Sequence, residues 1–496
     1  MSGAVFLGVD LGTQSVRAAA VDDDGPLPAV ASRALHSSRW RADDGSARHE
    51  QDPAAWCAAV DAVVAEVVAG LADPAAVRGI AVDGTSGTVV ALGAAGGPAG
   101  PGVMYDDARG HRHAERVRTV GAELWDRLGY RVGETWALPT LLALGPAPGY
   151  RHQTDVVTAH LVGAPTASDA STALKSGYDA LDGRWPVEVF EELGLDPTTL
   201  PTVVAPGSVL GGVGAAVAGR TGLAAGTPVV AGMTDGCAAQ LAAGAVAPGQ
   251  WNAVLGTTLV LKGVSETLLR DPGGTVYCHR GPQGGWWWPG GASNTGATVL
   301  ADLVDPSRFE ALTAALDRDP VRPPVVLPLP GRGERFPFAA PDAEGLWLPD
   351  DGGAARPLCE LAAAVGEEAA FAGVAEGVAF VERLAFERVA ALGADVSGTR
   401  SITGGATANR WWNQRRADVL GVPLDRPDQA EPAVGMALLA QAAVAADGGD
   451  PDLVAAARAV RDAAAVETCE PRPDAALEDR YARFRAALAE RGWVDP

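Results

Sequence analysis

The sequence has 496 residues, of which 47% are hydrophobic and 20% charged, with 62 glycines and 36 prolines. This composition excludes wholesale disorder, and the length predicts roughly two to four domains. The net charge of −22 repels nucleic-acid phosphate and anionic lipid, so neither is an expected partner.

Five scattered cysteines include no CxxC pair, which favours reduced thiols over a disulfide framework. The first apolar run ends at Asp10 and follows no basic leader, so neither a signal peptide nor a membrane anchor is expected. We therefore expect a cytoplasmic protein that acts on small molecules as a monomer or homodimer.

The chain opens with two predicted strands, residues 5–9 and 16–21, joined by the turn Asp10-Leu11-Gly12-Thr13-Gln14-Ser15. A strand–turn–strand unit differs from the strand-to-helix phosphate loops of Rossmann and P-loop proteins. Gly12 lets backbone N–H groups approach an anion, the Thr13 hydroxyl can donate to it, and Asp10 can hold Mg²⁺ through water. Alone, so short a motif favours an ordinary Asx turn.

A predicted helix from Asp52-Pro53 and a predicted strand over 77–82 follow. The opening pattern then recurs, because predicted strands 251–255 and 259–264 flank the turn Gly256-Thr257-Thr258. Two Gly-Thr hairpins in one chain favour phosphate binding over two chance turns. The repeat predicts an internal duplication with a boundary near residue 245, hence domains 1–245 and 246–496.

Asp235 follows the predicted strand 227–231 and precedes a predicted helix. A carboxylate there can accept the proton of a hydroxyl that attacks a γ-phosphoryl group. A helix N-cap is the alternative interpretation. A third Gly-rich turn, Gly404-Gly405-Ala406 with Asn409, leaves room for a ring and ribose, although alone it favours a plain turn. Residues 433–491 read as Ala-rich helix.

Taken in order, these elements resemble the FGGY carbohydrate kinase family of the actin and hexokinase ATPase superfamily. The matching segments are FLGVDLGTQS (6–15), AGMTDG (231–236), VLGTT (254–258) and TGGATAN (403–409), with smaller matches in EQDPAAW (50–56), YDDAR (105–109) and ADVLGVP (417–423). Two departures are clear. Residues 139–150 lack the Lys and Trp of the family's first signature, and residues 341–376 lack the His-containing second signature.

The resemblance implies an α/β fold of two actin-like (ribonuclease H-like) ATPase domains, each a mixed sheet flanked by helices, with a cleft between them. It implies ATP and Mg²⁺ as cofactors, Asp235 as general base, and Asp10 as the metal-positioning residue near the sugar. The implied nucleotide contacts are Gly12, Thr13, Gln14, Gly256, Thr257, Thr258, Gly404, Gly405 and Asn409.

The acceptor contacts are expected in two loops, at Ser86 in Asp83-Gly84-Thr85-Ser86-Gly87-Thr88 and at Asp107 in the segment 105–109. The first loop has neither the Arg-Glu pair of glycerol kinases nor the Met-His-Gly of xylulose kinases. This version looks most like the D-ribulose kinases of plant and cyanobacterial type. The resemblance therefore implies transfer of a γ-phosphoryl group to a ketopentose, D-ribulose first and D-xylulose second.

Two alternatives stay open. A non-catalytic sugar- or nucleotide-binding relative could share the fold, although it would have no need of a base at Asp235. The run Trp286-Trp287-Trp288 could be a sugar-stacking platform, but a buried strand and turn is the favoured interpretation.

Overall fold

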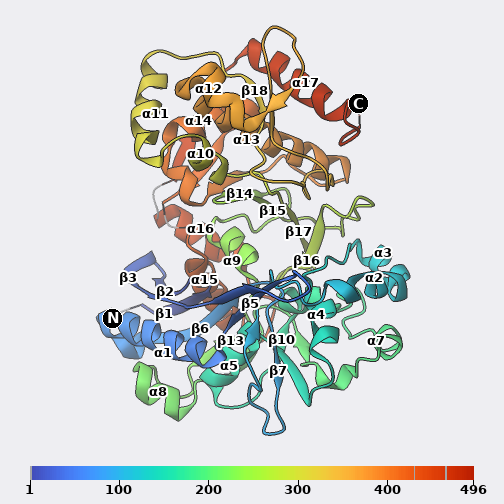
Figure 1. Cartoon of the computed structure of the whole chain (residues 1–496). Helices are drawn as coiled ribbons and strands as arrows, with labels where there is room; N and C mark the ends of the chain where they lie inside the picture. Colours follow the sequence, from blue (N-terminus) through green and yellow to red (C-terminus); the bar gives the residue numbers. More distant parts are fainter. Residues whose placement is uncertain (1–2, 429, 464–465, 496) are drawn as a thin grey trace.

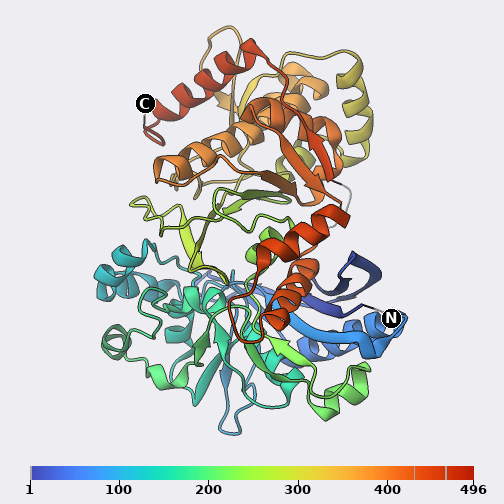
Figure 2. The ribbon, with the colours of Figure 1, turned by 180° about the vertical axis from the view of Figure 1, so that it is seen from behind.

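Two mixed β-sheets, one from each half of the chain, organise the molecule in a computed structural model that describes residues 3–428, 430–463 and 466–495 (Figures 1 and 2). The first sheet has the strand order β12-β13-β6-β1-β2-β3. Its strands are β1 Val5–Leu11, β2 Ser15–Asp22, β3 Gly25–Ala34, β6 Val77–Gly84, β12 Val209–Gly212 and β13 Pro228–Val230. Strands β1, β2 and β3 pair antiparallel, whereas β6 pairs parallel with β1 and with β13.

The second sheet repeats this topology in the order β16-β17-β15-β14-β21-β22-β23. Its strands are β14 Trp251–Leu255, β15 Leu259–Gly263, β16 Tyr277–Arg280, β17 Trp287–Ala292, β21 Arg400–Thr403, β22 Leu424–Pro427 and β23 Val466–Cys469. An antiparallel β14–β15–β17 meander again adjoins the parallel strands β21 and β22. Only β16, at the outer edge, has no counterpart in the first sheet. The expected α/β class with two mixed sheets flanked by helices is confirmed.

Side chains of β1 alternate between two cores, because successive residues of a strand point to opposite faces. Leu7, Val9 and Leu11 pack in one core with helix α1 (Pro53–Gly70), whereas Phe6 packs in another with helices α9 (Asp235–Ala242) and α15 (Pro432–Ala445). Asp52 caps α1 by accepting a hydrogen bond from the backbone of Ala54. Both faces of the first sheet are therefore covered.

Helix α1 is long and apolar enough, by length and composition alone, to cross a membrane. Its apolar residues Trp56, Val60, Val64 and Val67 are instead buried against the first sheet. It is a core helix of this fold.

Helix α15 lies beyond the expected boundary near residue 245, yet it packs on β1 and β6 of the first sheet. In Figure 2, which shows the molecule from behind, this helix and α16 (Leu453–Ala463) lie in front of the first sheet. The approach is close: a Cβ atom on Gly8 would lie 1.8 Å from the Ala433 carbonyl oxygen, and one on Gly435 would lie 2.2 Å from that of Ala238. Glycine at these positions lets α15 contact both β1 and α9.

The expectation that residues 433–491 form Ala-rich helix is only partly met, because three separate helices, Pro432–Ala445, Leu453–Ala463 and Ala475–Ala489, occupy this segment. Strand β23 interrupts the segment and pairs antiparallel with β22. Its sequence Val-Glu-Thr-Cys carries β-branched residues that suit an edge strand.

Smaller elements surround the two sheets. A five-stranded sheet in the first half has the order β4-β5-β8-β7-β9, and a three-stranded sheet in the second half has the order β18-β19-β20. Their strands are β4 Ser38–Arg41, β5 Ala47–Gln51, β7 Val89–Leu92, β8 Gly102–Val103, β9 Gly149–His152, β18 Val325–Leu327, β19 Leu346–Leu348 and β20 Arg356–Pro357. A pair of two-residue strands is β10 Ser168–Asp169 and β11 Val203–Val204.

The remaining helices are α2 His111–Val120, α3 Ala122–Leu128, α4 Ala137–Leu144, α5 Gln153–Val162, α6 Ala170–Ala173, α7 Val187–Leu193, α8 Ala215–Thr221, α10 Thr298–Leu303, α11 Phe309–Arg318, α12 Leu361–Val365, α13 Glu367–Ala391, α14 Arg410–Leu420, α16 Leu453–Ala463 and α17 Ala475–Ala489.

Candidate active site

Two carboxylates lie side by side where β1 and β6 end. The parallel register pairs Asp10 with Asp83, and both side chains project to the face that α9 and α15 cover, as Phe6 and Ala81 do. Asp83 is fully buried and Asp10 is 8% exposed. Burial raises the pKa of Asp10 to about 6, and the charge of Asp235 acts in the same direction. Burial, and then the charge of Asp10, raises the pKa of Asp83 well above its usual range.

These two carboxylates fit a magnesium site. Neither buried oxygen of Asp83 receives a hydrogen bond from an N–H or hydroxyl group in the described part of the protein. Its polar neighbour is the Asp10 carboxyl, and a hydrogen bond between the two acids lowers the pKa of Asp10 and raises that of Asp83. Mg²⁺ is typically bound by one or two carboxylates and completed by waters and substrate phosphates. Within the described residues no cluster of three or more His, Cys, Asp or Glu side chains could hold a metal ion.

Asp235 joins this pair from the start of α9. It is the first helical residue, and the N-cap is Thr234, so the alternative interpretation of Asp235 as the N-cap is wrong. Its Oδ1 accepts a hydrogen bond of 2.7 Å from the Gly236 backbone N–H. Burial raises the pKa of Asp235, while Lys175 and Lys262 act against that increase. The structure thus brings Asp10, Asp83 and Asp235 into one electrostatically coupled group.

The two predicted phosphate hairpins have the same strand–turn–strand topology, but the turn of the first is one residue longer. In the first, the Gly12 N–H donates to the Ser15 carbonyl at 3.1 Å, and in the second the Gly256 N–H donates to the Thr258 carbonyl at 3.1 Å. The residues at the tips, Gln14 and Thr257, are exposed. Each hairpin ends the corresponding pair of strands in its sheet, β1–β2 or β14–β15.

The third Gly-rich turn lies beside the second hairpin. Gly404 has φ +93°, and a Cβ atom there would lie 2.5 Å from the Leu255 carbonyl oxygen at the end of β14. Gly405 is exposed with open space around its Cα. Asn409 caps α14 by accepting from the Trp412 N–H at 3.0 Å, and its amide donates to Thr313 at 3.0 Å. Its side chain therefore holds this turn against α11.

The expected acceptor residues differ in their surroundings. The Ser86 hydroxyl is buried without a hydrogen-bond partner, and the Ser86 carbonyl accepts from Lys175 at 3.0 Å. Asp107 is fully buried, and its two oxygens accept hydrogen bonds from Arg109 and from the His49 backbone. Asp107 is thus held by protein groups, whereas the Ser86 hydroxyl has no partner within the described part of the protein.

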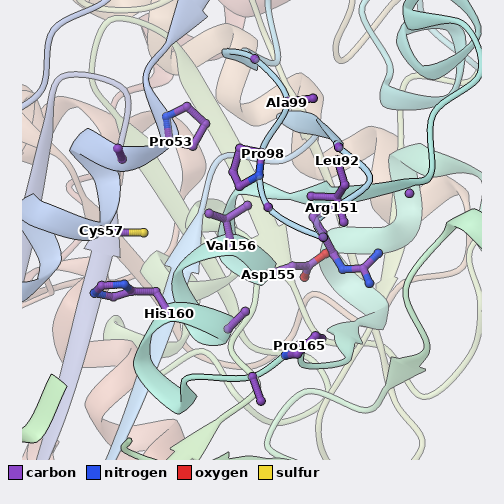
Figure 3. A pocket seen from close by; sticks show the side chains of 18 of the residues that line it. Pro53, Cys57, Leu92, Pro98, Ala99, Arg151, Asp155, Val156, His160 and Pro165 are labelled. Carbon is purple, nitrogen blue, oxygen red and sulfur yellow. The ribbon is translucent and has the colours of Figure 1, made fainter. Parts of the chain in front are cut away.

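Other features that the sequence suggested have structural explanations. Trp287 and Trp288 lie in β17 and are buried, in agreement with the favoured interpretation of a strand. A groove of about 1350 Å³ lies outside the site, between α1, α5 and the loop after β7 (Figure 3). His160 and Asp61 on its wall are paired at 2.9 Å, and no predicted site residue lines it.

Sequence reasoning missed three residues of this site. Asp83 could have been found, because Asp83-Gly84-Thr85 at the end of β6 repeats the Asp and Gly-Thr of the first hairpin. Lys175 and Lys262 carry no local motif. Their interaction with Asp235 depends on contacts between segments that are distant in the sequence, and for Lys262 on how the two halves of the chain pack.

Comparisons with known proteins identify the family of this chain. The sequence model of the FGGY family of carbohydrate kinases, N-terminal domain, matches residues 5–129, and that of the C-terminal domain matches residues 251–444. A xylulose kinase of Streptomyces coelicolor is 29% identical over 473 residues, covering 91% of this chain and 90% of that protein. An apulose kinase of Pectobacterium atrosepticum is 27% identical over 458 residues, covering 88% of each.

Solved structures give the same fold. The xylulose kinase from Rhodospirillum rubrum superposes with a TM-score of 0.81 at 25% identity, covering 98% of both chains. A structure described as a xyloylose kinase from Brucella ovis superposes with a TM-score of 0.85 at 23% identity, covering 98% of this chain and 99% of that one. The chain therefore belongs to the FGGY family of carbohydrate kinases, enzymes that transfer a phosphoryl group from ATP, with Mg²⁺, to a sugar.

Proposed function

We propose that this kinase phosphorylates a hydroxyl group of a pentulose, with Asp235 as the general base. The observation that carries the proposal is the position of Asp235 at the start of α9, beside the acidic pair Asp10–Asp83. Phosphoryl transfer needs mainly positioning, charge stabilisation and one base for the attacking hydroxyl. This group of residues supplies all three.

In the proposed mechanism, Asp235 accepts the hydroxyl proton as the acceptor oxygen attacks the γ-phosphorus, and ADP leaves. Asp10 and Asp83 would hold Mg²⁺, which neutralises charge on the ATP phosphates when it is bound. Backbone N–H groups of the two hairpins, at Gly12 to Gln14 and Gly256 to Thr258, would contact those phosphates. Gly404 and Gly405 would border the adenosine.

For the sugar, the relatives favour D-xylulose over D-ribulose, which reverses the order that the acceptor loop suggested. Five relatives at 24–29% identity are named xylulose kinases, and one at 27% is named an apulose kinase. The loop itself departs from the Met-His-Gly of xylulose kinases and offers the unpartnered Ser86 hydroxyl instead. We keep D-ribulose as the second candidate because Ser86 can donate to a hydroxyl or ketone oxygen of either sugar.

Replacing the base tests the reaction. In Asp235→Asn we expect kcat to fall by about 10²–10⁴-fold while ATP still binds, since only proton transfer is lost. The rate of ADP release with Mg-ATP and pentulose measures kcat. Calorimetric titration measures the binding of ATP. Asp24→Asn, on an exposed turn, is the matched control. Turnover of Asp235→Asn at the control's rate would rule out Asp235 as the base.

The acceptor is tested by ADP release across D-xylulose, D-ribulose, L-xylulose, L-ribulose, ribitol, glycerol and no sugar. We expect the highest kcat/KM with D-xylulose or D-ribulose. A higher kcat/KM for a polyol would confirm kinase activity but show that the preferred acceptor is not a pentulose. Bound ATP without turnover on any compound of the panel would favour a non-catalytic relative.

A further inference from the structure

Ser171 forms a buried contact between the two halves of the chain, beside the proposed base. It lies in α6 of the first half, and its side chain is fully buried. Its Oγ lies 3.2 Å from Nδ1 of His279, a residue of β16 in the second sheet, and accepts a hydrogen bond of 3.2 Å from the Thr234 backbone N–H. Thr234 immediately precedes Asp235. One hydroxyl group therefore connects the edge strand of the second half to the turn that carries the base.

The other contacts of this hydroxyl are with the same turn and the helix that follows it. Thr234 is the N-cap of α9, a position where a hydroxyl usually accepts from the first turn of its helix. The Thr234 hydroxyl instead lies 3.3 Å from Ser171 Oγ, and the Ser171 hydroxyl lies 3.8 Å from Cys237 Sγ in the first turn of α9. Backbone and side chain of Thr234 thus both contact Ser171, so the place of Ser171 constrains the place of this turn.

Ser171 has a firm support of its own. Asp169 Oδ1 accepts a hydrogen bond of 2.8 Å from the Ser171 backbone N–H, which fixes the start of α6. The base turn is also paired with the end of β6, through a bridge between Thr234 and Gly84. The turn therefore has two supports, Ser171 on α6 and the last residue of β6.

Strand β16 also contacts the first half through the two residues before His279. The Tyr130 hydroxyl donates to the Cys278 carbonyl at 3.4 Å. The rings of Trp136 and Tyr277 meet edge to face, with 6.2 Å between their centroids. The position of His279 relative to α6 therefore depends on how the two halves of the chain pack.

We propose that Ser171 and His279 are positioning residues for the base: through Ser171, the second half of the chain holds the Thr234 turn where the Asp235 carboxylate can reach the acceptor hydroxyl. A general base must come within about 3 Å of the group that it deprotonates, and a displacement of about 1 Å costs on the order of a hundredfold in rate. The contact between the halves thereby takes part in catalysis, because the base is fully positioned only when β16 lies against α6. The inference rests on the proposed function in taking Asp235 as the base, and it requires no particular sugar.

Ser171→Ala tests the hydroxyl. We expect kcat with the best acceptor to fall by about 10–100-fold while the KM for ATP stays unchanged, because the ATP contacts lie elsewhere. Ser176→Ala is the matched control: Ser176 is also fully buried, and its hydroxyl is hydrogen-bonded to the His152 imidazole at 2.8 Å, within the first half. Both variants lose a buried hydroxyl–imidazole contact, but only Ser171→Ala should lose kcat. The same kcat in both serine variants would overturn the inference.

Two amide variants test the imidazole. In His279→Asn the side-chain amide takes roughly the place of Nδ1, whereas in His279→Gln it reaches roughly that of Nε2. We expect His279→Asn to keep most of kcat, and His279→Gln to lose as much as Ser171→Ala. The double variant Ser171→Ala/His279→Gln should lose no more than either single variant, because both break the same link. A merely structural need for the ring would affect both amide variants alike. Equal kcat in the two, or additive losses in the double variant, would refute a role through Ser171. If Ser171→Ala does not fold, the amide pair decides.

Hydrogen exchange gives a readout without substrate. The Thr234 N–H is protected by its bond to Ser171, so exchange over residues 231–236 should become about tenfold faster in Ser171→Ala and stay unchanged in Ser176→Ala. Unchanged exchange in Ser171→Ala would contradict the inference. Full turnover of Asp235→Asn would reject both the proposed base and this inference, whereas full turnover of Ser171→Ala with an inactive Asp235→Asn would reject the inference alone.

Discussion

The carboxylates Asp10 and Asp83 destabilise the folded protein when both are ionised and no cation is bound. Asp10 and Asp83 are buried neighbours, and the pKa of Asp10 is raised from 3.8 to about 6. The folded state therefore binds this proton more tightly than the unfolded chain does. The resulting stability is complete below about pH 4 and is lost as pH rises through about 6.

We therefore expect Asp83→Asn to unfold a few degrees above the wild type at pH 7.5 without Mg²⁺, because the variant removes a like charge beside Asp10. At pH 5 the difference should shrink, since Asp10 and Asp83 are then largely protonated in the wild type. Differential scanning calorimetry at both pH values measures this.

Added Mg²⁺ should raise the unfolding temperature of the wild type more than that of Asp83→Asn, because a ligand stabilises the state that binds it. If Asp83→Asn were less stable than the wild type at pH 7.5 without Mg²⁺, the prediction that Asp83 destabilises the folded protein through Asp10 would be wrong.

Two glycines in the turns that follow β14 and β21 are expected to differ in role: Gly404 is needed for the fold, and Gly256 for phosphate binding. A Cβ atom on Gly256 would meet nothing within 4 Å, whereas one on Gly404 would lie 2.5 Å from the Leu255 carbonyl at φ +93°. Gly256→Ala should therefore leave the unfolding temperature unchanged and raise the KM for ATP by about tenfold, roughly 1.4 kcal/mol, by blocking phosphate approach. Gly404→Ala should instead lower stability by about 1–3 kcal/mol.

Thermal melts and ATP titrations of both variants test this contrast. An unchanged KM in Gly256→Ala would exclude the second hairpin from the phosphate site.

At the scale of the whole molecule, α15 joins the two halves. Phe6, Ala81 and Val230 of the first sheet pack in one core with this helix, which is more than 180 residues further along the chain than α9. A fragment of residues 1–245 would expose that face to water. We expect the fragment to melt without a cooperative transition and to bind a hydrophobic dye.

Adding the fragment 246–496, which carries α15, should restore a cooperative transition. A cooperative melt of residues 1–245 alone would show that the first half folds independently of α15.

Local sequence patterns were sufficient to predict many of the elements that carry the candidate site. The hairpins at Gly12 and Gly256, the strand that leads to Asp235 and the helix from Pro53 follow from alternation, turn glycines and caps, all of which act over a few residues. Strand β23 was missed because its short sequence lies within Ala-rich helical segments whose propensity dominates any window.

The two repeated strand–turn–strand units, the order of the motifs and the carboxylate at the start of α9 follow from residues adjacent in the chain. The position of Asp83 beside Asp10, the hydrogen bond from the His49 backbone to Asp107, and the approach of Lys175 and Lys262 to Asp235 depend instead on the tertiary structure. Sheet register and the packing of the two halves bring these residues together, and contacts between distant segments leave no periodic trace in the sequence around them.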